Sequence, residues 1–288
     1  MQRLPALGLI AVTAVWGSTF VLIKNLLDDL PVLDFLAVRF AVAALVMMAL
    51  FGRHVRRLSH DQVIRAVALG VVYALAQIVQ TYGLSTTPAA VSGFVTGTYV
   101  VLTPIFGALL LRQRTTPALW LAVALATAGL ALLALRGLSV GIGELLTLGS
   151  AALYALHIVG LGQWSHARDA LGLATMQMVA IAALCAIAAS PGGIALPATS
   201  GAWAAVLYTA LAAGVFALVV QTWAQAHLTA TRAAVIMTME PVFAAAFAVG
   251  LGGETLGWRA LAGGVLVLAA MYVAELGPRR TPVLVHPL

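Results

Sequence analysis

Long apolar segments alternate with short polar segments along the whole chain. A helix needs roughly 20 apolar residues to cross a bilayer core, and these segments have about that length. They are apolar on all sides and rich in Ala and Leu, whereas strands of a membrane barrel alternate in polarity over about ten residues. The pattern therefore predicts an all-α polytopic membrane protein with ten transmembrane helices. The predicted spans are Leu4–Leu26, Val32–Phe51, Val63–Leu84, Ala89–Leu111, Ala118–Leu135, Gly143–Leu161, Leu171–Ala189, Trp203–Thr222, Ala233–Leu251 and Leu256–Leu276.

Composition supports a membrane protein and narrows its partners. Of the 288 residues, 62% are hydrophobic and only 8% are charged, against roughly a quarter charged in soluble domains. The net charge of +6 is spread over many short loops, so we expect no nucleic-acid partner. The partners expected are the lipid bilayer and a small molecule. Cys185 is the only cysteine, which excludes an intrachain disulfide and a thiol metal cluster.

The basic residues predict the orientation of the chain. Cytoplasmic loops of membrane proteins are enriched in Lys and Arg. Counted on alternate sides of the predicted spans, eleven of these residues fall on one side and three on the other. The larger group is Arg3, Arg53, Arg56, Arg57, Arg65, Arg112, Arg114, Arg168, Arg232, Arg279 and Arg280, and the smaller is Lys24, Arg136 and Arg259. Both termini are therefore predicted to be cytoplasmic, with the first span retained as a helix.

The two halves of the sequence match each other when the chain is shifted by about 141 positions. The shift places 80–82 (Gln-Thr-Tyr) on 221–223 (Gln-Thr-Trp), Tyr99 on Glu240 and Gln113 on Glu254. Each repeat has five spans, an odd number, so the second repeat enters the membrane in the opposite sense. Inverted repeats are typical of transporters whose binding site lies near the midplane. We predict repeats at residues 1–137 and 138–278 and a cytoplasmic tail at 279–288.

Several short motifs add a family resemblance that covers nearly the whole chain. They are Trp16-Gly17, Ala89-Ala90-Val91, Thr96-Gly97, Pro104, Arg232-Ala233-Ala234, Glu240-Pro241 and Gly253-Glu254-Thr255-Leu256. In their order and spacing the chain resembles the drug/metabolite transporter superfamily, specifically its ten-span EamA-type exporters. One departure is Arg112-Gln113-Arg114, where such proteins often have a Gly-Glu pair in the first repeat.

The resemblance implies export of amino acids or related metabolites, commonly by bacteria, by alternating access through a central cavity. The sequence looks most like the aromatic and neutral amino-acid exporter branch. The expected location is the bacterial inner membrane, and the strong preference for Arg over Lys is typical of a GC-rich bacterial genome.

Two charged residues lie inside predicted spans. A carboxylate within a span costs several kcal/mol unless it faces a cavity, finds a partner or binds a proton. Glu240 is followed by Pro241, which removes the backbone donor for the Met237 carbonyl, so the helix is expected to kink there. For Glu240, a ligand for a substrate amine, a proton-coupling site and a structural acid all remain open. For Arg39, the alternatives are a substrate carboxylate ligand, a structural pairing with another helix and a side chain reaching toward the interface.

Polar side chains recur at helical spacing in several spans, and in lipid such stripes must turn inward. Two interpretations remain open: a wet cavity for a polar solute, or hydrogen bonds between helices. The candidate substrate-binding residues are Trp16, Tyr73, Gln77, Gln80, Tyr82, Tyr99, Tyr154, His157, Gln221, Trp223 and Gln225. Pro104 and Pro241 are the candidate kinks, and the small residues Ala89, Gly93 and Gly97 predict a close helix contact.

Other classes of membrane protein fit less well. An intramembrane enzyme would need a nucleophile, an acid pair or a metal cluster at suitable spacing, and the sequence shows none. We expect no metal and no cofactor. An ATP-driven pump would need a Gly-Lys-Ser/Thr loop, which is missing because the only lysine, Lys24, follows Ile23. A passive channel and a structural membrane subunit remain the alternatives, and the oligomeric state stays open.

Overall fold

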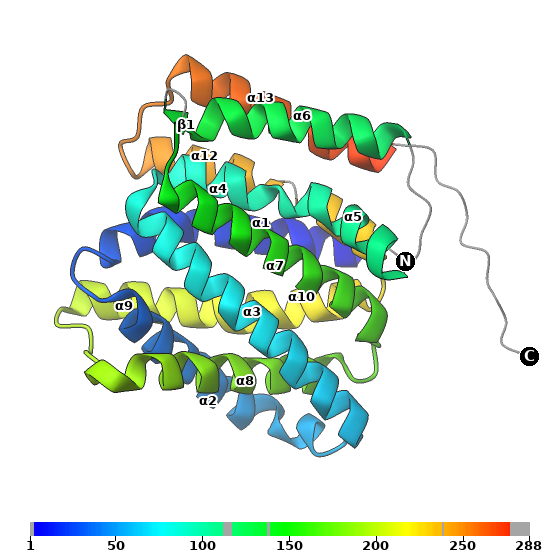
Figure 1. Cartoon of the computed structure of the whole chain (residues 1–288). Coiled ribbons are helices and arrows are strands. Elements are labelled where there is room, and N and C mark those ends of the chain that lie inside the picture. Colours follow the sequence, from blue (N-terminus) through cyan, green and yellow to red (C-terminus); the bar gives the residue numbers. More distant parts are fainter. Residues whose placement is uncertain (1–2, 112–116, 137–138, 238, 277–288) are drawn as a thin grey trace, which may run out of the picture.

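The computed structural model describes residues 3–111, 117–136, 139–237 and 239–276, and its helices lie side by side in one bundle (Figure 1). In the first repeat the elements are α1 (Arg3–Leu26), α2 (Val32–Val55), α3 (His60–Thr86), α4 (Ala89–Gly97), α5 (Tyr99–Leu111), α6 (Pro117–Ala134) and the strands β1 (Leu135–Arg136) and β2 (Ser139–Val140). In the second repeat they are α7 (Ile142–Trp164), α8 (Ala170–Ala189), the 3-10 turn η1 (Ser190–Gly192), α9 (Ser200–Tyr208), the π-helix η2 (Thr209–Phe216), α10 (Ala217–Gln225), α11 (Ala230–Ile236), α12 (Met239–Gly250) and α13 (Trp258–Leu276). The all-α prediction is confirmed, and the one short hairpin of the described chain connects α6 to α7.

Three of the predicted spans are irregular. The fourth is divided at Thr98 into α4 and α5, and the ninth is divided after Met237 into α11 and α12. The eighth contains the π-helix η2, a wide turn that often marks functional sites. In the part of the chain that the structure describes, seven helical segments are long and apolar enough to cross a membrane alone. The segments Met239–Gly250 and Trp258–Ala270 are shorter apolar helices.

The two prolines expected to kink the chain have different surroundings. Pro241 lies in the first turn of α12, directly after the division of the ninth span, and its missing N–H is tolerated there. Pro104 lies inside α5, which continues through it to Leu111. The fourth span is divided at Thr98, so its interruption precedes Pro104 by more than one helical turn.

The sequence repeats are interlocked in space. Helix α1 packs mainly against α12 and α10 of the second repeat, and α7 packs mainly against α3 and α5 of the first. The corresponding helices α2 and α8 form one flank of the bundle, and α6 and α13 form the opposite flank (Figure 1). Any moving unit must therefore combine helices of both repeats.

The outer surface of the bundle is apolar, as a lipid-facing surface requires. Leu109 is 71% exposed, Val265 64% and Trp120 65%, all on long apolar helices. The described chain begins with α1 and ends with α13 at the same end of the bundle (Figure 1). This arrangement agrees with an even number of spans, whereas the cytoplasmic position of that end stays a prediction.

Glycines permit the closest helix contacts around the centre of the bundle. A Cβ atom at Gly17 of α1 would lie 2.6 Å from Cβ of Phe243 and 2.8 Å from the backbone nitrogen of Ala244. A Cβ at Gly93 of α4 would lie 2.5 Å from Cβ of Ala244. Real side chains do not approach so closely, so α12 lies against α1 and α4 only because both positions lack a side chain. The predicted small-residue contact of α4 is therefore present at Gly93.

We expect Gly17→Ala to separate α1 from α12 and to lower the melting temperature of the purified protein. Overpacking a tight contact costs about 1–3 kcal/mol. The control is Gly250→Ala, because nothing lies within 4 Å of a Cβ at Gly250 on α12. Thermal unfolding followed by tryptophan fluorescence in detergent measures both changes. Equal melting temperatures for the two variants would contradict this account of the contact.

Candidate transport site

A central cavity lies between the interlocked repeats and is lined by polar and aromatic side chains. Its lining residues are Trp16, Thr19, Phe20, Ile23, Arg39, Tyr73, Gln77, Gln80, Thr81, Leu84, Thr96, Tyr99, Tyr154, His157, Ile158, Gln221, Met237 and Glu240. On α3 the lining extends from Tyr73 to Leu84, which at 1.5 Å per residue is about 16 Å along the helix. It therefore runs from the middle of the bundle toward the end of α3 that the basic residues predict to be non-cytoplasmic.

A chain of hydrogen bonds crosses one wall of this cavity. Arg39 of α2 donates from Nη1 to Oε1 of Gln77 on α3 at 3.4 Å. Nε2 of Gln77 donates to the Tyr154 hydroxyl of α7 at 2.6 Å, and that hydroxyl donates to Oε1 of Gln80 at 2.7 Å. Nε2 of Gln80 then donates to Oγ1 of Thr96 on α4 at 3.1 Å. The chain links four helices, and Tyr154 is its central member.

Glu240 lies on the opposite wall, beside both helix interruptions. The Tyr99 hydroxyl, at the start of α5, lies 2.9 Å from Oε2 of Glu240 and 3.1 Å from the Met237 carbonyl oxygen. The N–H of Glu240 also donates to that carbonyl at 3.0 Å. Pro241 has no N–H for the Met237 carbonyl, and this carbonyl instead accepts from the Tyr99 hydroxyl and the Glu240 N–H.

The contact between Tyr99 and Glu240 joins equivalent positions of the two repeats. The residues are 141 positions apart, which is the shift that aligns the repeats. Two equivalent points of a two-fold arrangement can touch only near its axis. The pair therefore marks the pseudo-two-fold axis, and one member carries a carboxylate where the other carries a phenol.

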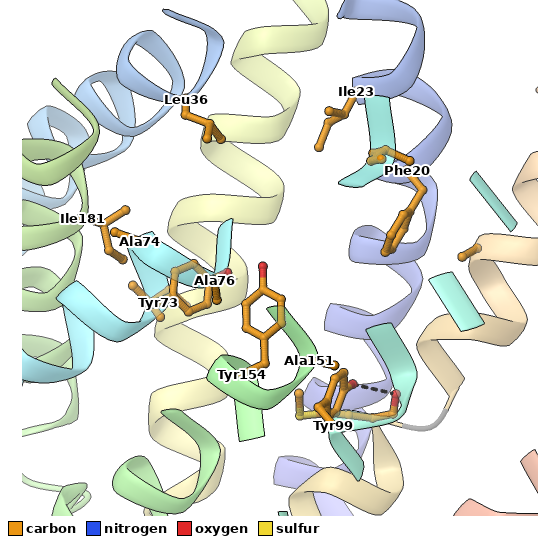
Figure 2. Packing of buried hydrophobic residues seen from close by; sticks show 14 of the residues in the cluster. Phe20, Ile23, Leu36, Tyr73, Ala74, Ala76, Tyr99, Ala151, Tyr154 and Ile181 are labelled. Carbon is orange, nitrogen blue, oxygen red and sulfur yellow. Dashed lines mark hydrogen bonds between the residues drawn. The ribbon is translucent and has the colours of Figure 1, made fainter. Parts of the chain in front are cut away.

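Aromatic rings form a continuous surface between the two polar walls. The Tyr154 ring lies 5.6 Å from the Tyr73 ring and 6.5 Å from the Tyr99 ring, measured between centroids (Figure 2). His157 packs its edge against Tyr73 at 5.0 Å and pairs through Nε2 with Oε1 of Gln177 at 2.9 Å. Such edge-to-face contacts fix the ring orientations. The cavity therefore offers both aromatic edges and hydrogen-bonding groups.

Most of the side chains proposed from the sequence face this cavity, and three do not. Tyr82 is 41% exposed on the outer surface. The Trp223 ring lies 5.1 Å from the His227 ring, and Gln225 is buried behind the lining residue Ile158, to whose carbonyl it donates at 3.0 Å. Residues two apart on a helix point about 200° apart, so Tyr82 cannot share the face of Gln80. Trp223 likewise lies two positions from Gln221, which lines the cavity.

The lining also includes apolar residues that the polar pattern did not single out. Phe20 and Ile23 follow Trp16 at helical spacing on α1, and Leu84 continues the inward face of α3. The period of these helices, applied from Trp16 and Gln77, would have placed them. Trp16 itself donates from its indole nitrogen to the Ala213 carbonyl in η2 at 3.0 Å. Among the described residues, no group of His, Cys, Asp or Glu has an arrangement that could hold a metal ion.

Apolar helices in inverted repeats around a polar cavity define a multi-pass membrane transporter. The EamA-like transporter family matches residues 3–135 and again residues 141–275, once in each repeat. The chain belongs to this family, whose members are transporters and not enzymes. The finer resemblance to the aromatic and neutral amino-acid branch is not part of that match.

Relatives and a solved structure agree with this family. An uncharacterized transporter of Archaeoglobus fulgidus is 32% identical over 278 residues, covering 96% of this chain and 87% of the relative. The uncharacterized inner membrane transporter YedA of Escherichia coli K12 is 28% identical over 291 residues, covering 94% of this chain and 91% of YedA. A crystal structure at 22% identity covers 93% of this chain and 96% of its own with a TM-score of 0.69, so it shares the fold.

We expect Tyr154→Phe to destabilise the protein, because it removes both hydrogen bonds that join α7 to Gln77 and Gln80. Unsatisfied buried polar groups cost about 1–3 kcal/mol. The matched control is Tyr208→Phe, which removes a hydroxyl paired with Ser18 at 2.8 Å in an exposed position. Melting temperatures in detergent compare the two variants. An equal effect of both would show that the Tyr154 hydroxyl bonds contribute no special stability.

Proposed function

We propose that this protein exports amino acids or related small metabolites by alternating access through the central cavity. The observation that supports this most directly is the position of Glu240, 5% exposed and facing a cavity that also presents amides and phenols. A carboxylate at membrane depth is retained where it lines a solute path. The proposed ligand of Glu240 is the ammonium group of the solute.

The aromatic lining supports amino acids with neutral or aromatic side chains as the preferred solutes. Tyr73, Tyr154 and Tyr99 present ring edges, and Trp16 and Phe20 add apolar surface on α1. A site of this kind binds an apolar body through its walls and fixes orientation through a few polar groups. We propose a bacterial inner membrane as the location, which the similarity to the inner membrane transporter YedA supports.

Alternating access requires two conformations related by exchange of the roles of the repeats. The interlocked packing supports a motion of mixed bundles, because α1 stays with α12 and α7 stays with α3. The interrupted fourth and ninth spans supply places where half-helices can turn separately. The pair Tyr99 and Glu240, near the pseudo-axis, is the proposed pivot of this motion.

We expect Glu240→Gln to reduce the transport rate at least about tenfold, because the loss of one hydrogen bond to a charged group has about this effect. The yield and the melting temperature should stay near normal. The amide retains an acceptor for the Tyr99 hydroxyl but loses the charge that would bind an ammonium group. Asp29→Asn is the control, because it removes a carboxylate from an exposed loop. Uptake of radiolabelled amino acids into proteoliposomes measures the effect. Wild-type rates in the Glu240 variant would remove this carboxylate from the mechanism.

A passive channel is the second candidate for the same cavity, and kinetics separate it from a carrier. We expect uptake to saturate with solute concentration and to accelerate when unlabelled solute is preloaded inside the vesicles. A carrier shows this counterflow because its loaded site returns faster than its empty site. Uptake is measured with and without a pH gradient, so that dependence on the gradient reveals proton coupling. Linear, unsaturable flux without counterflow would support the channel instead.

A further inference from the structure

Arg39 is a buried cation that faces the central cavity. Its side chain is 2% exposed, and its guanidinium carbon lies 4.8 Å from the Phe40 ring centroid and 5.7 Å from that of Phe35. A charge at membrane depth is costly unless it is paired or solvated. Its burial and its place in the cavity lining exclude a side chain that reaches toward the interface.

Within the described part of the chain, no carboxylate balances this charge. The one side-chain acceptor of Arg39 is the amide oxygen of Gln77, at a long 3.4 Å, and its Nε is buried without a partner. Asp34, one and a half turns earlier on α2, accepts instead from the Ala195 N–H at 3.1 Å. A guanidinium has five N–H donors in a planar fork, so most of its capacity is unused. Among the described residues, the structural pairing of Arg39 with another helix consists of this one long bond to Gln77 of α3, which leaves the positive charge without a counterion.

We infer that Arg39 binds the carboxylate group of the transported solute. This inference rests on the proposed function and names the charge that its substrates carry. The planar fork of a guanidinium matches a carboxylate with two parallel hydrogen bonds. The Phe35 and Phe40 rings pack against the guanidinium and lower the polarity around it, which strengthens such a pair.

Charge balance favours a carboxylate over a phosphate group. Arg39 and Glu240 are the charged side chains in the cavity lining, one of each sign. A solute with one carboxylate on Arg39 and one ammonium group on Glu240 leaves no charge unpaired. A dianionic phosphate would leave a net negative charge in a medium of low dielectric constant. The site therefore selects a zwitterion with one group of each sign.

The second repeat shows that the scaffold tolerates a neutral side chain at this place. Gln177 lies as far from the start of α8 as Arg39 lies from the start of α2, and it too is buried. Its amide is satisfied by His157 at 2.9 Å and by the Leu173 carbonyl at 3.3 Å. An amide thus fits the scaffold, and the positive charge at Arg39 is an addition specific to the first repeat.

The test uses the full-length protein in proteoliposomes and a panel of matched solutes. For each amino acid, the panel includes the amine without the carboxylate and the acid without the amino group. The variants are Arg39→Gln and Arg39→Lys, and the control is Arg65→Gln, which removes an exposed arginine of α3. Melting temperatures confirm that each variant is folded.

We expect the wild type to carry solutes that have a carboxylate. In Arg39→Gln, the KM for these solutes should rise roughly tenfold or more, because hydrogen bonds to a charged group are lost. The KM of any transported amine should stay within about twofold, Arg39→Lys should recover part of the loss, and Arg65→Gln should match the wild type.

Two results would overturn the inference and leave the proposed transport function standing. The first is that the wild-type protein transports the amines but none of the matching solutes that have a carboxylate. This result is observed on the wild-type protein alone and requires no variant to fold. The other is an equal rise in KM for amines and acids in Arg39→Gln. A wild type that carries no member of the panel would remove the proposed amino-acid function together with the inference.

Discussion

Hydrocarbon offers no hydrogen bonds, so every polar group within the bundle has to find its partner inside the protein or in a cavity. The interrupted spans show how this constraint is met. The carboxylate of Glu254 accepts from the free N–H groups of Ala89 and Ala90, at 2.7 and 3.2 Å, where α4 begins. The Tyr99 hydroxyl meets the Met237 carbonyl where the ninth span is divided. Side chains thus satisfy backbone groups both where a span begins, at Ala89, and where one is interrupted, at Met237.

The same constraint separates scaffold from function. Tyr99 and Glu240 occupy equivalent positions and touch each other, and Arg39 and Gln177 occupy corresponding places on α2 and α8. In each pair one repeat has a neutral side chain that its neighbours satisfy, while the other has a charge that lines the cavity. The fold is nearly symmetric, but the chemistry is not. An asymmetric solute needs such a difference between the repeats.

The spans could be predicted from the sequence because their length is set by the bilayer, and Glu240 stood out because a carboxylate within a span is rare. The interruption at Thr98 was not predicted, and the Tyr99 hydroxyl that follows it contacts a residue 141 positions away, which local sequence does not indicate. Tyr82 was among the candidate substrate-binding residues, although its position two residues after Gln80 turns it outward. The interlocking of α1 with α12 and of α7 with α3 has no sequence signal, because apolar surfaces pack on one another with little specificity.

The three irregular spans, the fourth, eighth and ninth, all adjoin the central cavity. Trp16 donates to the carbonyl of Ala213 within the π-helix of the eighth span, Tyr99 begins the second half of the fourth, and Glu240 begins the second half of the ninth. A regular helix transmits motion along its whole length, whereas a divided one lets each half turn about the interruption. At the interruption of the ninth span, the Tyr99 hydroxyl contacts both the Met237 carbonyl and Glu240, so this contact joins the halves of two different spans. The residues that would bind the solute are therefore the same residues that hold the half-helices together, which gives solute binding a direct physical route to bias the conformation.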